Sequence, residues 1–286
     1  MDVKIYNTNT DRIVIETVAL DGTGDYEEDG NFIIPGVNTP GSEVKCKFVK
    51  PVGSMTGQLF PSGNQQQQIL RVQPSSLMPN EEPFDVRVTL IDSANPFVLI
   101  DTTSIQTALL ATIPSDASRN ALVESIRRAG AVDMGLATDI ETAGRTRGTP
   151  KAALVYPPSF TLDSERPDIR IQAYSMGLPH PSLQLTGAVT VAVALSYPST
   201  IVAALSTMGA TVNGISPPTP EQSPPPEDRK HEFGLDREVL IEHSKGTIKV
   251  DVAMEEHGGV ASCAVSRTAR RLFEGKVRYY VQEDGI

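Results

Sequence analysis

The chain contains 286 residues, of which 39% are hydrophobic and 21% are charged, and it can bury a sizeable core in one large domain or two ordinary ones. Its formal net charge of −10 argues against a footprint on a phosphate backbone. Tryptophan is absent and other aromatic residues are few, so stacking surfaces for single-stranded nucleic acid are not expected either. Nucleic acid is therefore excluded as an expected partner.

The first half of the chain predicts short strands separated by turns. Alternating or β-branched apolar runs occur at residues 3–6, 13–18, 32–34, 44–49, 84–91 and 97–100. Asp21-Gly22, Asp29-Gly30 and Pro35-Gly36 form turns between some of them. The pattern indicates a meander rather than a βαβ series.

Three helices are predicted. The first is capped by Ser115-Asp116 and runs through Ala129, with Gly130 as its stop signal. The second runs from 182 to about 197 and is apolar on nearly every side, and a short third helix follows Ser199. The second helix is too short to span a bilayer, so we expect it to be enclosed by protein and expect no membrane role.

The remainder of the chain returns to strands. Residues 216–230 are rich in proline and polar residues, which predicts a mobile loop. Alternating strands are then predicted at 239–242, 247–254, 260–267 and 276–282. Many strands and one helix that is apolar all round predict an α+β fold in which sheet wraps around a central helix.

The most specific candidate site is the run Ser175-Met176-Gly177-Leu178-Pro179-His180-Pro181, between a predicted strand at 169–174 and the apolar helix. Gly177 permits close backbone approach to a ligand, and Pro181 suits a first helical turn. The first-turn N–H groups and the helix dipole would form an anion site, with His180 placed to bind a carboxylate or move a proton. An ordinary strand-to-helix turn with a capping histidine is the alternative.

Other polar segments could contact a ligand, but their sequences favour structural interpretations. The run Leu59-Phe60-Pro61-Ser62-Gly63-Asn64 has the composition of a turn, and Asn95 begins a strand while able to present its amide to a carboxylate. The segment 243–246 resembles a tight hairpin whose His243 and Lys245 face solvent. The cationic run 267–271 is expected mainly to pair with the chain's own carboxylates.

The two cysteines point to a buried structural role and a reducing compartment. Cys46 and Cys263 form neither a disulfide framework nor a metal-ligand spacing. Cys263 lies in an alternating strand without a neighbouring His or helix N-terminus, so it is expected to be a small buried hydrophobe, as is Cys46. Residues 1–6 read directly as a strand without signal-peptide features, which favours a cytoplasmic location. The chain shows no Walker loop, Rossmann fingerprint, zinc spacing or nucleophile elbow.

Several segments, in this order, resemble the PrpF family of methylaconitate and aconitate isomerases and oxalomesaconate tautomerases. The most specific is 175–180 continuing into Leu185-Thr186-Gly187-Ala188. Similar segments lie at 5–10, 59–64, 95–98, 134–136, 149–151, 243–246 and 266–275. The resemblance spans essentially the whole chain, and no single segment carries it alone.

The resemblance implies a diaminopimelate-epimerase-like fold, in which two β-barrels each wrap around a central helix and the active site lies between them. Residues 51–261 would form a complete second barrel, with its central helix at about 182–197. Residues 1–50 and 262–286 would form part of the first barrel.

The resemblance also implies isomerase chemistry on unsaturated di- or tricarboxylates, moving a proton to shift or isomerise a C=C bond without metal or organic cofactor. His180 would be catalytic, through hydrogen bonding or proton relay. Substrate binding would fall to Ser175, Met176, Gly177, Thr186 and Gly187, with Asn95, Ser62, Gly63 and Asn64 as second choices.

The family's upstream portion carries a Gly-Asn-Cys-Gly-Asn-type motif and a lysine associated with proton transfer, and the resemblance places this chain after that portion. Two alternatives follow. One is a non-catalytic binding or scaffold protein that completes its barrel as a homodimer. The other is a repurposed enzyme in which His180 and Cys263 serve a different lyase or isomerase reaction.

Overall fold

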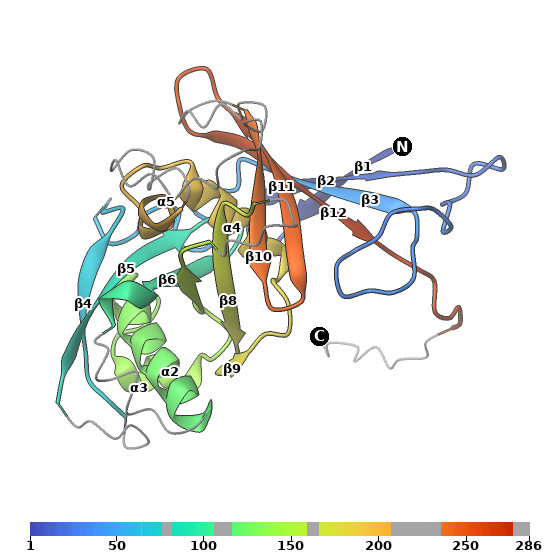
Figure 1. Cartoon of the computed structure of the whole chain (residues 1–286). Coiled ribbons are helices and arrows are strands. Elements are labelled where there is room, and N and C mark those ends of the chain that lie inside the picture. The colour runs from blue at the N-terminus through green and yellow to red at the C-terminus, as the bar shows by residue number, and fades with distance from the viewer. Residues whose placement is uncertain (64, 76–81, 106–115, 159–165, 207–235, 277–286) are drawn as a thin grey trace, which may run out of the picture.

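The computed structural model describes residues 1–63, 65–75, 82–105, 116–158, 166–206 and 236–276 (Figure 1). Within these ranges the strands are β1 (Asp2–Asn7), β2 (Arg12–Val18), β3 (Glu43–Val49), β4 (Gln68–Val72), β5 (Phe84–Asp92), β6 (Pro96–Asp101), β7 (Lys151–Tyr156), β8 (Ile169–Ser175), β9 (Leu178–Pro179), β10 (Arg237–His243), β11 (Gly246–Met254) and β12 (Val260–Thr268). The helices are α2 (Asp116–Asp133), α3 (Ile140–Arg145), α4 (Leu185–Leu195) and α5 (Ile201–Leu205), with a 3-10 turn η1 (Thr102–Ser104).

The described strands join one mixed sheet in the order β1-β2-β3-β12-β11-β10-β8-β7-β6-β5-β4, with β9 added beside β8. The meander prediction is confirmed for β1–β3 and for β4–β6, which pair antiparallel. The second half of the chain, for which no meander was predicted, adds the parallel pairs β6/β7 and β8/β10. Parallel neighbours require a crossover, and the helices supply it: α2 and α3 lie between β6 and β7, and α4 and α5 lie between β8 and β10.

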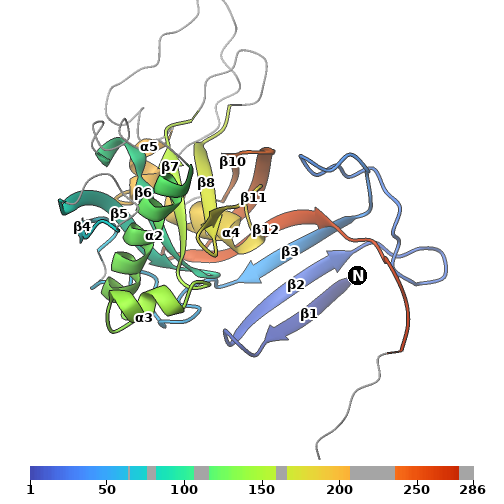
Figure 2. The same ribbon diagram turned by 90° about the horizontal axis from the view of Figure 1, so that it is seen from below.

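The apolar helix α4 lies inside a curl of the sheet. It contacts β11 and β12 on one side, and β5 and helix α5 on another (Figures 1 and 2). Every residue from 187 to 195 is buried as a result. The expectation that this helix is enclosed by protein is therefore confirmed, whereas the predicted closure of the sheet into barrels stays a prediction.

Among the helices that the structure describes, none combines the length and the apolar character needed to cross a membrane.

A second helix, α2, covers the opposite face of the same sheet. Strand β6 is buried along its whole length because its side chains alternate between two cores. Phe97 and Leu99 pack in the core around α4, and Val98 and Ile100 pack in the core under α2. Sheet alternation thus places α4 and α2 on opposite faces.

Strands β1, β2 and β3 extend away from the body that holds α2 and α4, and β12 joins them to that body by pairing with β3 (Figure 2). We call β1–β3 the arm. Side chains of β1 are mostly exposed, including Ile5 and Tyr6. The predicted assignment of residues 1–50 and 262–286 to one barrel and of 51–261 to another stays a prediction.

The predicted strand bounds agree closely with most observed strands, but one predicted strand is absent and some observed strands were missed. Residues 32–34 form no strand: Phe32 makes an isolated bridge to Gly41 before the chain turns. Strands β4 and β7 were not predicted, and the alanines Ala152 and Ala153 in β7 explain a weak strand signal. Residues 216–230 and 277–282 lie outside the described residues.

Gly130 does not stop a helix, because α2 continues to Asp133. A Cβ added at Gly130 would lie 2.5 Å from Val98 Cγ2 and 3.1 Å from Leu90 Cδ2. The glycine therefore permits close packing of α2 on the sheet, a role that a sequence pattern does not distinguish from a stop signal.

Gly130→Ala is expected to destabilise the protein by about 1–3 kcal/mol through overpacking, although alanine is the better helix former. Urea unfolding followed by circular dichroism measures the change. Gly22→Ala is the matched control, because a Cβ at Gly22 meets nothing within 4 Å. A Gly130→Ala protein as stable as the parent would contradict the close-packing role.

Candidate functional site

The run that begins at Ser175 forms the tip of a hairpin rather than the start of a helix. Ser175 pairs with Leu178 across the β8–β9 turn, and the two turn residues, Met176 and Gly177, have φ values of 55° and 80°. Positive φ at both central positions is the requirement of a type I′ hairpin turn. Arg147 donates from Nη2 to the Met176 carbonyl at 2.7 Å. The predicted position of Ser175, Met176 and Gly177 at a helix mouth is therefore wrong.

Helix α4 begins later than predicted, at Leu185, with Gln184 as its N-cap. Pro181 precedes the helix and is exposed, so it is not a first-turn residue. The ring nitrogen Nδ1 of His180 lies 2.7 Å from the Ser182 carbonyl and 3.2 Å from the Ser182 amide nitrogen. His180 thus belongs to the segment that leads into α4, and the hairpin turn separates it from Ser175.

A cavity of about 1110 Å³ opens at this entrance to α4, and we call it the α4 pocket. One wall is the loop 32–37, a second is the segment 180–185, and the rest comes from β3, β10, β11 and β12. The loop rests on the β10–β11 hairpin: a Cβ at Gly246 would lie 2.7 Å from Pro35 Cβ. This contact places the loop against the hairpin, where it forms a wall of the pocket.

Six cationic or titratable basic side chains line the α4 pocket, and two of them are neutralised locally. Lys45 lies 2.5 Å from Asp251, and Lys249 lies 3.1 Å from Glu238. The third lining carboxylate, Glu43, accepts a hydrogen bond from the Ser266 hydroxyl. The pocket's carboxylates are thus engaged with neighbouring groups.

The other four basic groups have no ion pair with any residue that the structure describes. They are His180, His243, Lys245 and Arg267, and they come from the α4 entrance, the β10–β11 hairpin and β12. Lys245 and Arg267 carry formal positive charge beside the two histidine rings, so the cavity is electropositive within a chain of net charge −10. This arrangement suits an anion with more than one charge.

The electrostatics confirm that these groups act on one another. Burial lowers the pKa of His243, and the positive charges of Arg267 and His180 lower it further. Burial also lowers the pKa of the Arg267 guanidinium. The Lys245 amide donates to His243 Nδ1 at 3.2 Å, so the neutral His243 ring carries its proton on Nε2 and can donate it.

The N-terminus of α4 adds backbone donors to the same cavity. Gln184 and Leu185 line it, and the side chain of Gln184 makes no capping hydrogen bond. First-turn N–H groups of a helix lack intrahelical partners and favour anions. The predicted combination of His180 with a helix N-terminus is thus present, although Ser175, Met176 and Gly177 are not among the lining residues.

Thr186 and Gly187 lie in the first turn of α4 but do not line the pocket. Gly187 is buried, and a Cβ there would lie 3.1 Å from both Phe97 Cζ and Leu183 Cδ1 and 3.3 Å from Gln184 Oε1. Its role in the structure is to leave room for these three neighbours.

The second-choice residues lie away from the α4 pocket. The Asn95 carbonyl accepts a hydrogen bond from Thr190 Oγ1 at 3.4 Å. The Ser62 hydroxyl donates to Gln68 Oε1 at 2.5 Å, and Gly63 adopts a turn conformation with φ of 74°. Asn64 lies outside the described residues. The structure gives these residues turn and packing contacts, and their predicted role in binding stays a prediction.

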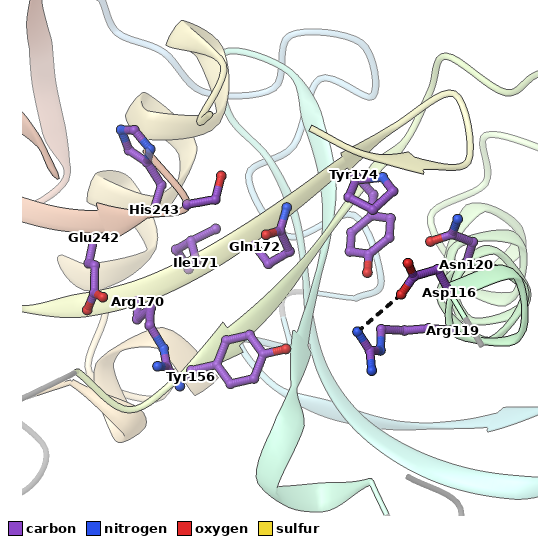
Figure 3. A pocket seen from close by; sticks show the side chains of 12 residues that line it. Asp116, Arg119, Asn120, Tyr156, Arg170, Ile171, Gln172, Tyr174, Glu242 and His243 are labelled. Atoms are coloured by element: carbon purple, nitrogen blue, oxygen red, sulfur yellow. Dashed lines mark ion pairs between the residues drawn. The ribbon is translucent and has the colours of Figure 1, made fainter. Parts of the chain in front are cut away.

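A smaller cavity of about 410 Å³ lies between α2 and strands β8 and β10 (Figure 3). Its formal charges are balanced: Arg119 pairs with Asp116 at 3.7 Å, and Glu242 lines the cavity together with Arg170. The Arg170 guanidinium lies 4.7 Å from the centre of the Tyr156 ring. Burial raises the pKa of Tyr174 to about 12, so this phenol stays protonated. His243 lines both cavities, but only the α4 pocket has an excess of positive charge.

The expected roles of the cationic run 267–271 are confirmed with one exception. Arg270 lies 3.3 Å from Asp29, and Arg271 lies 3.5 Å from Glu28, so both pair with the chain's own carboxylates. Arg267 instead faces the α4 pocket. The two-residue alternation of β12 indicates this orientation of Arg267, because Arg267 shares a face with Val265 and Cys263, which pack around α4.

His243 also differs from its prediction. The tight β10–β11 hairpin is confirmed by the pairing of His243 with Gly246. The side chain of His243, however, is partly buried in the pocket wall rather than turned to solvent. A hairpin sequence alone does not reveal that the loop 32–37 packs against the hairpin at Lys245 and Gly246.

Both cysteines are buried, as predicted. Cys263 is 0% exposed in the core around α4, and burial raises its pKa to about 12. Burial likewise raises the pKa of Cys46. Cys263 does not line the α4 pocket, so the structure does not support its pairing with His180 in a repurposed reaction. No group of three or more His, Cys, Asp or Glu side chains able to hold a metal occurs among the described residues.

The fold and the pocket together define an α+β protein with a cavity lined by basic side chains at the entrance to a buried helix. Residues 1–215 match the family described as PrpF protein, and the chain therefore belongs to the PrpF family.

Individual relatives agree with this assignment. The chain is 30% identical to the 2-methyl-aconitate isomerase of Shewanella oneidensis, with 96% of the chain and 65% of that protein aligned. It is 26% identical to the (4E)-oxalomesaconate Delta-isomerase of Novosphingobium sp., over 96% of the chain and 64% of that protein. The solved structure of a methylitaconate-delta-isomerase matches with a TM-score of 0.68 at 23% identity, over 97% of the chain and 65% of that structure. The chain thus spans about 65% of the length of these relatives.

The pKa of His243 is expected to lie below its ordinary value of about 6.5, and to rise when the charge of Arg267 is removed in Arg267→Gln. A bound polycarboxylate should raise it too, because an anion favours the protonated ring. Carboxylate affinity should therefore increase as the pH is lowered toward the pKa of His243.

Titration of the histidine ring protons by NMR measures this pKa, with His243→Asn identifying the signal. Arg270→Gln is the matched control, because Arg270 pairs with Asp29 outside the pocket. A His243 pKa that does not change in Arg267→Gln would contradict the proximity of the two groups.

Neither thiol is expected to react with Ellman's reagent at pH 8 in the folded protein, because each is buried with a raised pKa. Both should react once the protein is unfolded in guanidinium. Cys46→Ser isolates the signal of Cys263. Stoichiometric modification of Cys263 in the native Cys46→Ser protein would show that its thiol is accessible. Cys263 would then again be a candidate catalytic residue.

Proposed function

We propose that this chain is an isomerase that binds an unsaturated di- or tricarboxylate in the α4 pocket and moves a proton to shift or isomerise its C=C bond. The observation that carries the proposal is the convergence of four basic side chains without ion-pair partners on the N-terminus of α4, within the described part of the chain. The printed activities of the relatives, on methylaconitate, oxalomesaconate and methylitaconate, support the same substrate class.

The chemistry follows from the charges. Removing a proton from a carbon next to a carboxylate or a conjugated C=C builds negative charge on the substrate's oxygens. Backbone donors at the start of α4 and the guanidinium of Arg267 would stabilise that charge in a partly desolvated cavity. The reaction moves only a proton, so it requires no redox group and no organic cofactor.

His180 has the geometry of a proton carrier in this proposal. When its Nδ1–H donates to the Ser182 carbonyl at 2.7 Å, its Nε2 retains a lone pair. The ring is partly buried at the pocket wall, where a substrate carbon could approach it. Neutral His243 would donate from Nε2 to a substrate carboxylate.

Incubation with cis-aconitate in D₂O, followed by ¹H NMR, tests the activity. We expect deuterium incorporation or formation of an isomer, with the rate falling at least about tenfold in His180→Ala and in Arg267→Gln and unchanged in Arg270→Gln. The methylaconitate isomerase relative, run in parallel with methylaconitate and methylitaconate as further substrates, controls for the choice of acid. Turnover by the relative without turnover or binding by this chain would contradict the proposal.

A second candidate is a binding or scaffold protein that pairs through its arm. The exposed strand β1 lies at the edge of the sheet, and Ile5 and Tyr6 on it are 39% and 59% exposed. Such an edge can template pairing with another chain, here a second copy. Light scattering distinguishes the candidates: a folded, strictly monomeric and catalytically active chain would exclude this one.

A further inference from the structure

The smaller cavity, between α2 and strands β8 and β10, plays no part in the proposed function, and we call it the α2 cavity. Its volume of about 410 Å³ lies within the range of small-molecule sites, roughly 300–1,000 Å³. Ile171 and Pro179 give it apolar surface beside the rings of Tyr156 and Tyr174. Its polar groups decide which ligand it can bind.

The charged side chains of the α2 cavity are already engaged within the protein. Arg119 pairs with Asp116 at 3.7 Å, and the Arg170 guanidinium lies 4.7 Å from the centre of the Tyr156 ring. Glu242 is the second carboxylate among the described lining residues, so the two arginines leave no excess of positive charge. The α2 cavity therefore does not select for a polyanion, in contrast to the α4 pocket, and it suits an uncharged ligand.

Two phenol hydroxyls face the α2 cavity without a hydrogen-bond partner. Neither Tyr156 nor Tyr174 makes a side-chain hydrogen bond within the part of the chain that the structure describes, and neither hydroxyl oxygen is sealed from solvent. Figure 3 shows both hydroxyls directed toward the space beside Arg119. Burial raises the pKa of both phenols, so each keeps its O–H proton. The cavity thus contains two neutral donors that converge.

Gln172 adds an acceptor to the same cavity. Its Nε2 donates to the carbonyls of Ala173 and His180, each at 3.1 Å. These two bonds fix the orientation of the amide and leave Oε1 as its other end. Oε1 has no partner among the described residues and is not sealed from solvent. Because Gln172 and Tyr174 are two residues apart on β8, their side chains share the face of the sheet that borders the α2 cavity.

An amide group complements these three partners. Its carbonyl oxygen has two lone pairs and can accept from both phenols, while its N–H can donate to Gln172 Oε1. An amide carries its donor and its acceptor on separate atoms, which suits partners two residues apart on a strand, at a spacing of roughly 6.5–6.8 Å. A carboxylate offers no donor to Oε1, and the cavity has no excess of positive charge to match it.

We propose that the α2 cavity is a second ligand site, separate from the α4 pocket, for an uncharged amide or lactam with an apolar body. Tyr156 and Tyr174 donate to its carbonyl oxygen, and its N–H donates to Gln172 Oε1. Its apolar body packs against Ile171 and Pro179. None of these five residues lines the α4 pocket, so the site goes beyond the proposed isomerase function and does not depend on it.

NMR titration of the isotope-labelled full chain with three benzene derivatives tests the inference. Benzamide has both amide groups, N,N-dimethylbenzamide lacks the N–H, and benzoate carries a charge. The parent chain should bind benzamide saturably and about tenfold more tightly than either of the others, with the largest shift changes at the amides of Gln172 and Tyr174. Tyr156→Phe and Tyr174→Phe should each weaken benzamide binding about fivefold, the effect of one lost hydrogen bond.

A further variant and two controls separate a ligand role from a structural one. In Gln172→Leu, benzamide and N,N-dimethylbenzamide should bind equally, because the acceptor that distinguishes them is gone. Tyr197→Phe removes a partly buried phenol that lines neither cavity and should leave the affinities unchanged. Tyr174→Phe should be as stable as the parent in urea, because its hydroxyl has no partner in the described structure.

Four outcomes would each overturn the inference. These are no saturable binding of benzamide by the parent, benzoate binding as tight as benzamide, unchanged benzamide affinity in both phenylalanine variants, and shift changes concentrated at Leu185 and the loop 32–37. The last would place benzamide in the α4 pocket. Failure of the proposed function is distinguishable, because isomerase turnover without benzamide binding sinks this inference alone. Benzamide binding as predicted without turnover sinks the isomerase activity alone.

Discussion

The burial of α4 within the curled sheet is the constraint on which the rest of the structure depends. Residues 187–195 are buried on all sides, so the sheet must pass the helix on more than one face. Strands β11 and β12 lie along one side and β5 along another, and β6 and β7 continue the sheet beneath α2. Because the helix is enclosed, its N-terminus is the part that lies at a cavity. The segment 180–185 leads the chain to that N-terminus.

The enclosure of α4 also determines where the basic side chains of the pocket lie. Strand β12 packs Cys263 and Val265 against the α4 core. Arg267 lies two residues after Val265 on the same face of the strand, so its side chain reaches the pocket beyond the end of the helix. The β10–β11 hairpin brings His243 to the same place, and the loop 32–37 lines the same pocket. The basic side chains that have no carboxylate partner in the described structure thus come together because of the strand register around a buried helix. They do not form a local sequence motif.

Much of the fold was predictable because it depends on periodicity. An all-apolar helix predicted enclosure, and two-residue alternation predicted β1–β3, β5, β6 and β10–β12. The candidate site was only partly predictable. His180 was placed correctly beside α4, but Met176 and Gly177 form a positive-φ turn that a methionine does not signal, and Pro181 suggested a helix start three residues too early. Gln184, His243 and Arg267 meet through tertiary contacts, which no local pattern encodes.

The central claim is that the ligand site is the α4 pocket rather than the hairpin turn that shares the sequence run with His180. NMR chemical-shift mapping with tricarballylate on isotope-labelled protein tests it most directly. The account predicts that the largest changes occur at the amides of Leu185, Thr186 and Gly187 and at the side chains of His243 and Arg267. Changes concentrated at Ser175, Met176 and Gly177, with the α4 amides unaffected, would contradict it.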